Sequence, residues 1–195
     1  ALDDNAPILA TEAVKQKKKG VIDKWNHYFP IYDSYFDKIQ NQELRLLEIG
    51  VGSGGSLFTL QKYFPKALIT GIDIIPDSKE FEEDNVRIFI GDQANVSFLE
   101  KVNAETGPYD IVIDDGGHTM NQQLTSFKTL FPLIKDGGFY IIEDIHTSYW
   151  PGYFDGVEKT IDVLKGLIDG LNFWAMEKID IIEDGRAKAK IVNRE

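Results

Sequence analysis

The chain has 195 residues, 43% of them hydrophobic, and a formal net charge of -11 at pH 7. This length and composition favour one globular domain around a single core. The negative charge argues against a nucleic-acid partner, because a broad phosphate-binding face needs clustered Lys and Arg. The absence of cysteine excludes disulfides, zinc–thiolate sites and a cysteine nucleophile.

No apolar run reaches the roughly 18 residues that span a bilayer, and the acidic N-terminus lacks the order of a signal peptide. We therefore expect a cytoplasmic protein with no membrane partner, acting on a small molecule through oxygen and imidazole groups. The cysteine-free composition fits a reducing compartment.

The first 44 residues are predicted to form a helical cap segment, and residues 45–195 to form the main globular unit. Within the cap, Gly20–Gln40 is rich in aromatic residues and predicts one or two helices. Their aromatic side chains either cover the ligand edge of the main unit or pack into its core, and core packing is favoured for most of them.

From about residue 45, short apolar runs alternate with amphipathic stretches at the spacing of βαβ units. This alternation predicts a doubly wound, mostly parallel α/β sheet of the Rossmann-like class with helices on both faces. The predicted strands are Arg45–Gly50, Leu68–Asp73, Val86–Gly91, Tyr109–Asp114 and Gly138–Glu143. The predicted helices between them are Gly55–Tyr63, Val96–Ala104 and Met120–Leu133.

Beyond the last of these strands, Val157–Leu171 predicts a further helix. Two short apolar segments, Ile179–Ile182 and Ala187–Val192, then flank Asp184-Gly185, a turn-forming pair. The chain is therefore expected to end in a C-terminal antiparallel hairpin.

Each predicted strand ends in acidic or glycine residues, and ligands bind at this edge in open α/β sheets. A carboxylate at the end of one strand is explained by helix capping, but carboxylates at the ends of five strands in succession indicate a binding site. The acids concerned are Glu48, Asp73, Asp92, Asp114, Asp115, Glu143 and Asp144.

The segment Gly50-Val51-Gly52-Ser53-Gly54-Gly55 follows a predicted strand and begins a predicted helix, as ligand-binding glycine loops do. It also matches the dinucleotide pattern GxGxxG, with Asp73 at a suitable distance for a ribose, so a nicotinamide enzyme is an alternative. Glu48 favours a sulfonium cofactor with a free amino group instead, because its charge would repel a pyrophosphate. Asp92 and Gln93 are suited to the amino group of adenine.

Three carboxylates, Asp115, Glu143 and Asp144, close neighbouring strands and are expected to converge. Converging carboxylates repel one another unless a cation is shared, and a hard ion such as Mg²⁺ prefers oxygen ligands. The alternative is that these acids cap helices or pair with Lys and Arg. His118 lies near enough to Asp115 to serve as a general base on a substrate hydroxyl.

The loop Glu48–Gly54, with Asp73 and Asp92, resembles the cofactor motifs of class I S-adenosylmethionine-dependent methyltransferases. The resemblance implies that Gly50, Gly52, Ser53 and Gly54 lie near the methionine portion. It also implies Asp73 at the ribose and Asp92 or Gln93 at adenine, with Asp115 also placed beside the cofactor.

The segments Asp114–His118 and Ile142–Gly152 are similar to the mycinamicin-type macrolide-sugar O-methyltransferases, and more loosely to cephalosporin-hydroxylase-like proteins. In that family the residues matching Asp115, Glu143 and Asp144 bind magnesium, and the one matching His118 is the proposed base. The segment Asp23–Tyr32 resembles the stretch that leads into the family's domain. The family has a large additional N-terminal domain and a different C-terminal region, so its sugar substrate and assembly do not carry over, and a homo-oligomer is left open.

The leading hypothesis is therefore a magnesium-dependent O-methyltransferase acting on a hydroxylated small molecule, glycosylated or not. A catechol-type enzyme is a second hypothesis, but it would have Asp-Asn where this chain has Glu143-Asp144. A non-catalytic cofactor-binding module is a third. Further candidates near the acceptor are Tyr149, Trp150, Tyr153, His27 and His146, each with core packing or exposure as its alternative.

Overall fold

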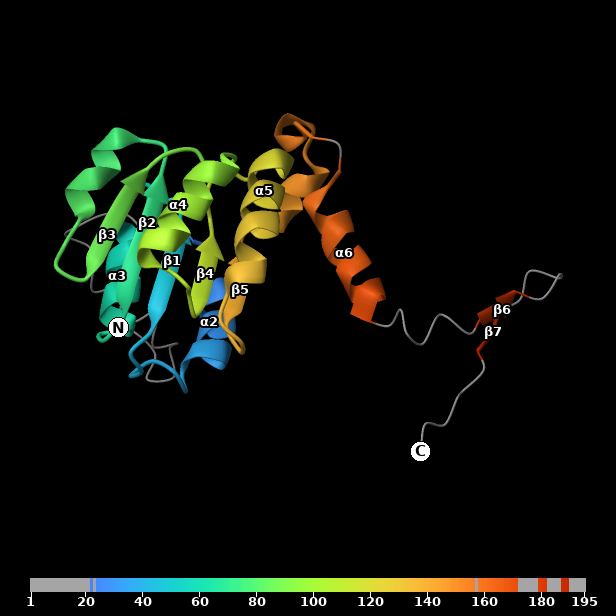
Figure 1. Cartoon of the computed structure of the whole chain (residues 1–195), viewed down its shortest axis with the longest axis horizontal. Helices are drawn as coiled ribbons and strands as arrows, with labels where there is room; N and C mark the ends of the chain where they lie inside the picture. Colours follow the sequence, from blue (N-terminus) through green and yellow to red (C-terminus); the bar gives the residue numbers. More distant parts are fainter. Residues whose placement is uncertain (1–21, 23, 157, 172–178, 182–186, 190–195) are drawn as a thin grey trace.

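The computed structural model describes residues 22, 24–156, 158–171, 179–181 and 187–189. Its centre is a five-stranded parallel sheet in the order β3-β2-β1-β4-β5 (Figure 1). The predicted parallel α/β architecture is confirmed. The strands are β1 (Arg45–Ile49), β2 (Leu68–Asp73), β3 (Val86–Ile90), β4 (Ile111–Asp114) and β5 (Phe139–Ile142).

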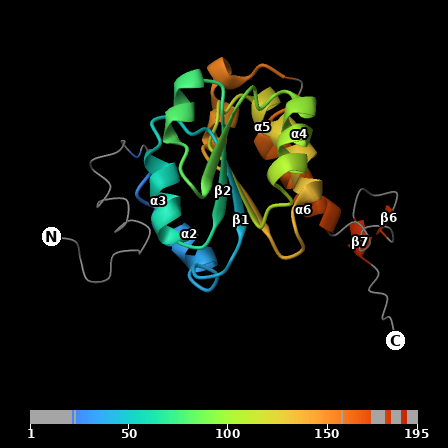
Figure 2. The same cartoon turned by 60° about the vertical axis from the view of Figure 1, so that its left-hand side comes forward.

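Helices cover both faces of this sheet. Figure 2 shows α2 (Tyr28–Phe36) and α3 (Gly55–Tyr63) on one side, and α4 (Val96–Thr106) and α5 (Met120–Leu130) on the other. After β5 the chain continues to α6 (Thr160–Leu171), which packs beside α5. Short 3-10 helices complete the connections: η1 (Pro76–Phe81), η2 (Phe131–Leu133), η3 (Ile145–Tyr149) and η4 (Pro151–Tyr153).

The strands are apolar on both faces, as expected for a parallel sheet buried between two helical layers. Along β1, Leu46 packs into the core under α2 and α3, whereas Leu47 and Ile49 pack into the core under α4 and α5. Alternate side chains of one strand therefore hold both layers in place.

The aromatic segment before β1 is mainly core, as favoured from the sequence. Phe29, Tyr32 and Phe36 of α2 are buried and pack against α3 and the sheet. Trp25 is 57% exposed. Residues 1–21 lie outside the described residues, so the division into a cap segment and a main unit stays a prediction.

Three helix boundaries differ from the prediction, and one is the end of α4, which runs to Thr106 and not to Ala104. The helix predicted to reach Leu133 ends at Leu130 and continues as η2, because Pro132 has no N–H to continue the α-helical hydrogen-bond pattern. The predicted helix from Val157 begins at Thr160, and Val157 itself lies outside the described residues.

At the C-terminal end, β6 (Ile179–Ile181) pairs antiparallel with β7 (Ala187–Ala189). The intervening turn at Asp184-Gly185 lies outside the described residues, so the hairpin stays a prediction. Among the described helices, none combines the length and apolar character required to cross a bilayer.

The strand order reverses between β1 and β4, which makes their carboxyl ends the expected ligand crevice. Gly50 follows β1 at this point with φ +91°, and a Cβ there would lie 2.1 Å from the backbone oxygen of Asp115. Glycine is thus required by both the left-handed backbone and the close approach of the two strand ends.

We predict that Gly50→Ala lowers the free energy of unfolding by about 3 kcal/mol or more, because left-handed strain and a backbone clash add. Urea denaturation followed by circular dichroism would measure it. Gly137→Ala is a matched control: Gly137 has φ +79°, but nothing lies within 4 Å of its ideal Cβ. The control should lose only about 1 kcal/mol, and equal losses in the two variants would contradict the close-approach explanation.

Candidate functional site

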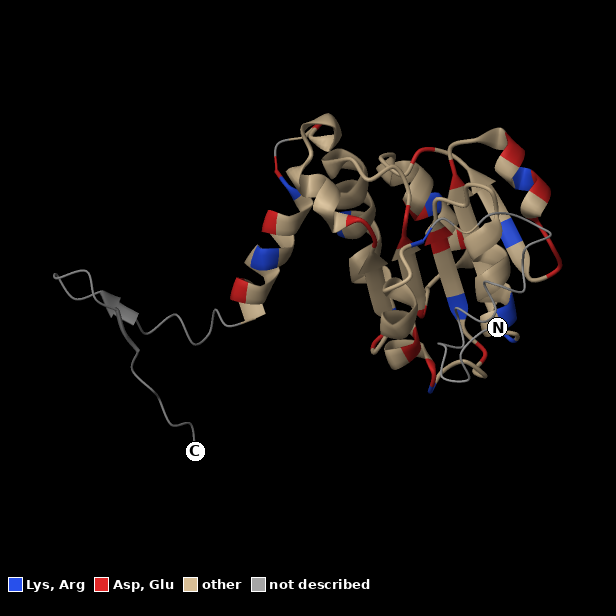
Figure 3. Cartoon of the chain, turned by 180° about the vertical axis from the view of Figure 1, so that it is seen from behind, with Lys and Arg blue, Asp and Glu red and all other residues tan. Residues whose placement is uncertain are grey.

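Two adjoining cavities lie at the carboxyl edge of the sheet. The first has a volume of about 260 Å³ and the second about 590 Å³. Gly50, Gly52 and Asp115 line both, so the cavities meet where β1 and β4 end. Acidic positions gather around this edge (Figure 3).

The first cavity lies over the ends of β1, β2 and β3. Ile72, Ile74 and Ile75 contribute apolar walls, and Asp73 lies among them. Asp73 is buried, and its two carboxylate oxygens accept hydrogen bonds from the backbone N–H groups of Gly52 and Ile75, each at 2.8 Å. The carboxylate is therefore fixed against the glycine loop at the cavity wall.

Asp92 and Gln93 also line the first cavity, but Gln93 is engaged within the protein. Its Nε2 donates to Asp114 Oδ1 and Ser126 Oγ, both at 3.0 Å, and its Oε1 accepts from the N–H of Gly117 at 2.8 Å. Gln93 thus fixes the loop that follows β4, a task the sequence did not reveal. Burial raises the pKa of Asp114 in this network to about 7.

Glu48 and Gly54 line neither cavity. Glu48 is fully buried, and the Ser56 hydroxyl donates to its Oε1. In the described part of the chain Oε2 has no hydrogen-bond partner, and burial raises the pKa of Glu48 to about 7. A Cβ atom added at Gly54 would lie against the Phe81 ring. Neither residue is therefore exposed to the cavities, whereas Ser53 lines the second one.

The predicted acidic group lines the second cavity, and so does a buried lysine side chain. Lys24 Nζ donates to Asp115 Oδ2 at 2.6 Å and also to Glu143 Oε1. The Tyr32 hydroxyl donates to the same Glu143 oxygen. The Lys24 side chain is 5% exposed and that of Glu143 3%. Burial and Asp115 raise the pKa of Glu143, and Lys24 opposes that shift.

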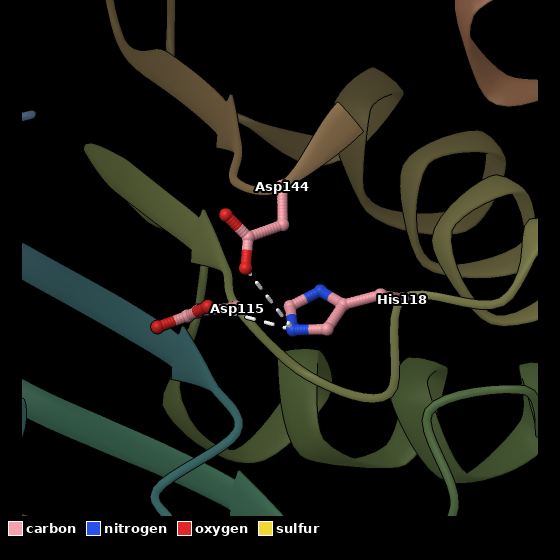
Figure 4. Close-up of side chains that lie close together, drawn as sticks. All are labelled: Asp115, His118 and Asp144. Carbon is pink, nitrogen blue, oxygen red and sulfur yellow. Dashed lines mark ion pairs between the residues drawn. The ribbon is translucent and has the colours of Figure 1, made fainter. Parts of the chain in front are cut away.

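Asp115, His118 and Asp144 form the other part of the group, and Figure 4 shows their side chains pointing toward one another. His118 Nε2 lies 3.8 Å from Asp115 Oδ1 and 3.7 Å from Asp144 Oδ2. One ligand atom from each residue lies within 4.8 Å of the others, a spacing that a divalent cation can draw together.

The backbone at this cluster is strained. His118 has φ 58° and Asp144 has φ 52°, both in the left-handed region that non-glycine residues rarely adopt. Asp144 is held by Tyr28, whose hydroxyl donates to Asp144 Oδ1 at 2.8 Å. Such strain occurs where the surrounding contacts fix a functional geometry.

Asp115 joins two parts of the acidic group that the sequence predicted as one triad. It lies with Asp144 beside His118, and it shares the Lys24 ammonium with Glu143, which also accepts from the Tyr32 hydroxyl. Sequence reasoning missed Lys24 as a site residue. The available signal was electrostatic: buried carboxylates need a positive partner, and Lys24 lies in the aromatic segment Gly20–Gln40, for which covering this edge was one of two interpretations.

Aromatic side chains border the second cavity. Trp25, Trp150, Tyr153 and His146 all line it, and Trp150 packs edge-on against His146 with ring centroids 4.7 Å apart. His27 packs against Trp25 and Tyr28 and is not part of that lining, and neither is Tyr149, which is 61% exposed. The Trp25 side chain is also largely exposed, so its ring is available at the cavity mouth.

Sequence comparison finds curated relatives among sugar O-methyltransferases. The chain is 41% identical over 167 residues to the 8-demethyl-8-(2-methoxy-alpha-L-rhamnosyl)-tetracenomycin-C 3'-O-methyltransferase of Streptomyces olivaceus, covering 77% of this chain and 43% of that protein. It is also 41% identical to the mycinamicin VI 2''-O-methyltransferase of Micromonospora griseorubida, covering 74% of this chain and 40% of the relative. The chain thus spans less than half the length of these relatives.

Structure comparison agrees. The MycE methyltransferase of the mycinamycin biosynthetic pathway, solved in complex with Mg and SAH, superposes with a TM-score of 0.77 at 36% identity. The match covers 88% of this chain and 47% of that one. A putative caffeoyl-CoA O-methyltransferase from Staphylococcus aureus shares the fold at a TM-score of 0.52 and 17% identity.

A family profile described as a methyltransferase domain matches residues 47–145, just over half of the chain. The matched segment runs from β1 through β5 and includes the glycine loop, Asp73, Asp115 and Glu143. This match favours the methyl-donor interpretation of the glycine loop over the nicotinamide alternative. The chain belongs to the methyltransferase domain family and has its Rossmann-like, class I fold.

Proposed function

We propose that this chain carries an S-adenosylmethionine-dependent, magnesium-assisted O-methyltransferase activity toward a hydroxyl of a glycosylated small molecule. The observation that carries the proposal is the cluster of Asp115, His118 and Asp144 beside two cavities that meet at the glycine loop. The relatives named as sugar O-methyltransferases, and a related structure solved with Mg and SAH, support it.

The methyl donor fits the two-part cavity. Its adenosine portion belongs in the apolar first cavity, with Asp73 at the ribose hydroxyls and Asp92 near adenine, while Gln93 fixes the neighbouring loop. Gly50 and Gly52 leave room for the backbone to approach the donor closely, and Ser53 lies toward its methionine portion. Glu48 lines neither cavity, so its predicted contact with the methyl donor stays a prediction.

The carboxylates of the second cavity suit a hard divalent cation, which we assign to Asp115, Glu143 and Asp144, with His118 adjacent. Carboxylate oxygens are the ligands that Mg²⁺ prefers. When bound, such an ion supplies positive charge that offsets the carboxylates and favours ionisation of an acceptor hydroxyl.

His118 is the proposed general base. Burial lowers its pKa, which favours the neutral imidazole, and in the tautomer protonated at Nδ1 the Nε2 lone pair accepts the hydroxyl proton. Asp115 and Asp144 then stabilise the imidazolium that proton uptake creates. The freed oxygen attacks the methyl carbon of the sulfonium, the carbon–sulfur bond breaks, and its electron pair stays on sulfur.

The aromatic border of the second cavity suits a sugar ring, because apolar ring faces stack on Trp side chains. Trp25 and Trp150 are the proposed stacking partners. The Glu143-Asp144 pair disfavours the catechol-type alternative. A homo-oligomer stays a prediction, and a cytoplasmic location is proposed because a cysteine-free chain suits a reducing compartment.

We predict that S-adenosylmethionine binds the purified chain with a micromolar dissociation constant, and that chelating divalent ions abolishes methyl transfer while retaining donor binding. Isothermal titration calorimetry with Mg²⁺ and then with EDTA would measure the binding. Donor binding with no metal dependence of turnover would contradict the metal assignment, and donor binding without any turnover would favour the non-catalytic module.

We predict that Asp144→Asn lowers metal-stimulated turnover at least about 100-fold, because one ligand charge beside His118 is lost. The side-chain shape is preserved, so the melting temperature should change little. Asp136→Asn, in an exposed turn, is the matched control and should retain full activity. Equal activity in both variants would remove Asp144 from the site.

We predict that His118→Asn lowers kcat by about 10² to 10⁴, the usual contribution of a general base, with donor affinity unchanged. Asn is chosen because it tolerates the left-handed backbone at this position. His27→Asn, at an exposed histidine outside the lining, is the control. Turnover of His118→Asn equal to that of the control would rule out the base assignment.

A further inference from the structure

Lys24 is a cation buried among acids. Its side chain is 5% exposed, and its ammonium bridges Asp115 and Glu143 from a segment outside the sheet. Burial alone would lower the pKa of Lys24, but Glu143, Asp115 and Glu48 together hold that pKa above its usual value. The ammonium is therefore the positive charge that allows these acids to be buried together.

The position of Lys24 overlaps the metal assignment. Lys24 donates to Oδ2 of Asp115 and Oε1 of Glu143, two of the carboxylates expected to bind a divalent cation. An ammonium and a divalent cation held by the same two carboxylates repel each other, because like charges a few Å apart in a buried site are poorly screened. Lys24 in its present position therefore opposes metal binding by Asp115, Glu143 and Asp144.

A second acceptor for Lys24 lies beside it. Glu48 is fully buried, and its Oε2 has no hydrogen-bond partner within the described residues. Lys24 and Ser56 line the same small cavity, and Ser56 donates to the other oxygen of Glu48. The shared cavity lining places Lys24 near Ser56 and hence near its partner Glu48, and the charge of Glu48 raises the pKa of Lys24.

We propose that Lys24 is an exchangeable internal counter-ion that holds Asp115 and Glu143 in the metal-free protein and transfers to Glu48 when a divalent cation binds. The inference rests on the metal assignment in the proposed function. A consequence is that metal binding also neutralises Glu48, the carboxylate beneath the glycine loop. The metal site and the glycine loop are thereby coupled through the Lys24 side chain.

The test is the Mg²⁺ dissociation constant, measured by titration calorimetry without methyl donor or acceptor. Lys24→Met removes the competing charge, so it should bind Mg²⁺ at least about ten-fold more tightly than the wild type. It should also melt at a lower temperature in EDTA, because the buried carboxylates lose their partner. Lys135→Met, which breaks the exposed Lys135–Asp110 pair of 2.7 Å, is the matched control and should leave Mg²⁺ affinity unchanged.

Glu48→Gln provides a second test in a chain that keeps Lys24. Loss of the receiving carboxylate should weaken Mg²⁺ binding several-fold, and the same change should have no effect in the Lys24→Met background. This non-additivity is specific to transfer of the ammonium. The Glu48→Gln single variant keeps the proposal testable if Lys24→Met fails to fold, because Mg²⁺ binding as tight as that of the wild type would overturn the transfer.

Unchanged or weaker Mg²⁺ binding by Lys24→Met would overturn the counter-ion role and make Lys24 a fixed positioning residue. An additive effect of Glu48→Gln in both backgrounds would overturn the transfer to Glu48. If the wild type bound methyl donor but no divalent cation, the metal assignment itself would fail and the counter-ion role with it. That outcome can be distinguished from the others because it is seen with the wild-type protein, before any variant is compared.

Discussion

The burial of several carboxylates beside one ammonium group is the constraint on which this site depends. Glu48 ends β1, Asp115 follows β4 and Glu143 follows β5, so the parallel topology brings their charges to one edge. Buried carboxylates without a partner are strongly destabilising. Lys24 offsets that cost from outside the sheet, and its hydrogen bonds connect the segment before α2 to the ends of β4 and β5.

The loop after β4 is held from two sides by separate buried networks. On the α5 side, Gln93 binds both Asp114 and the N–H of Gly117. On the α2 side, Lys24 binds Asp115. His118 follows with its left-handed backbone, so its imidazole is presented by a loop that is braced at both ends. In its proposed role as general base, His118 would lose little conformational entropy when a substrate arrives, because the protein has already ordered it.

Much of the fold and part of the site could be predicted from the sequence. Apolar runs and glycine spacing depend on local order, so they located β1–β5, the loop at Gly50 and the acids that end each strand. Pairing across the sheet was not accessible: Lys24 is 91 residues from Asp115 and 119 from Glu143 along the chain. The burial of a given side chain was equally inaccessible from the sequence. A strand-end acid such as Glu48 has the same local pattern whether it lines a cavity or lies beneath it.

The residues where the two cavities meet differ from those that border the acceptor side, so alignment of the reacting atoms and choice of acceptor depend on different parts of the fold. On the proposed function, donor and acceptor must align within contact distance of one methyl group. Gly50, Gly52 and Asp115 form the shared wall. The two glycines contribute only backbone, which is held because the N–H of Gly50 donates to the Ile72 carbonyl and that of Gly52 donates to the Asp73 carboxylate. The acceptor side is instead bordered by Trp25 and Trp150, which belong to connecting segments and not to the sheet. Changes in those segments can alter the acceptor without disturbing the alignment of the reacting atoms.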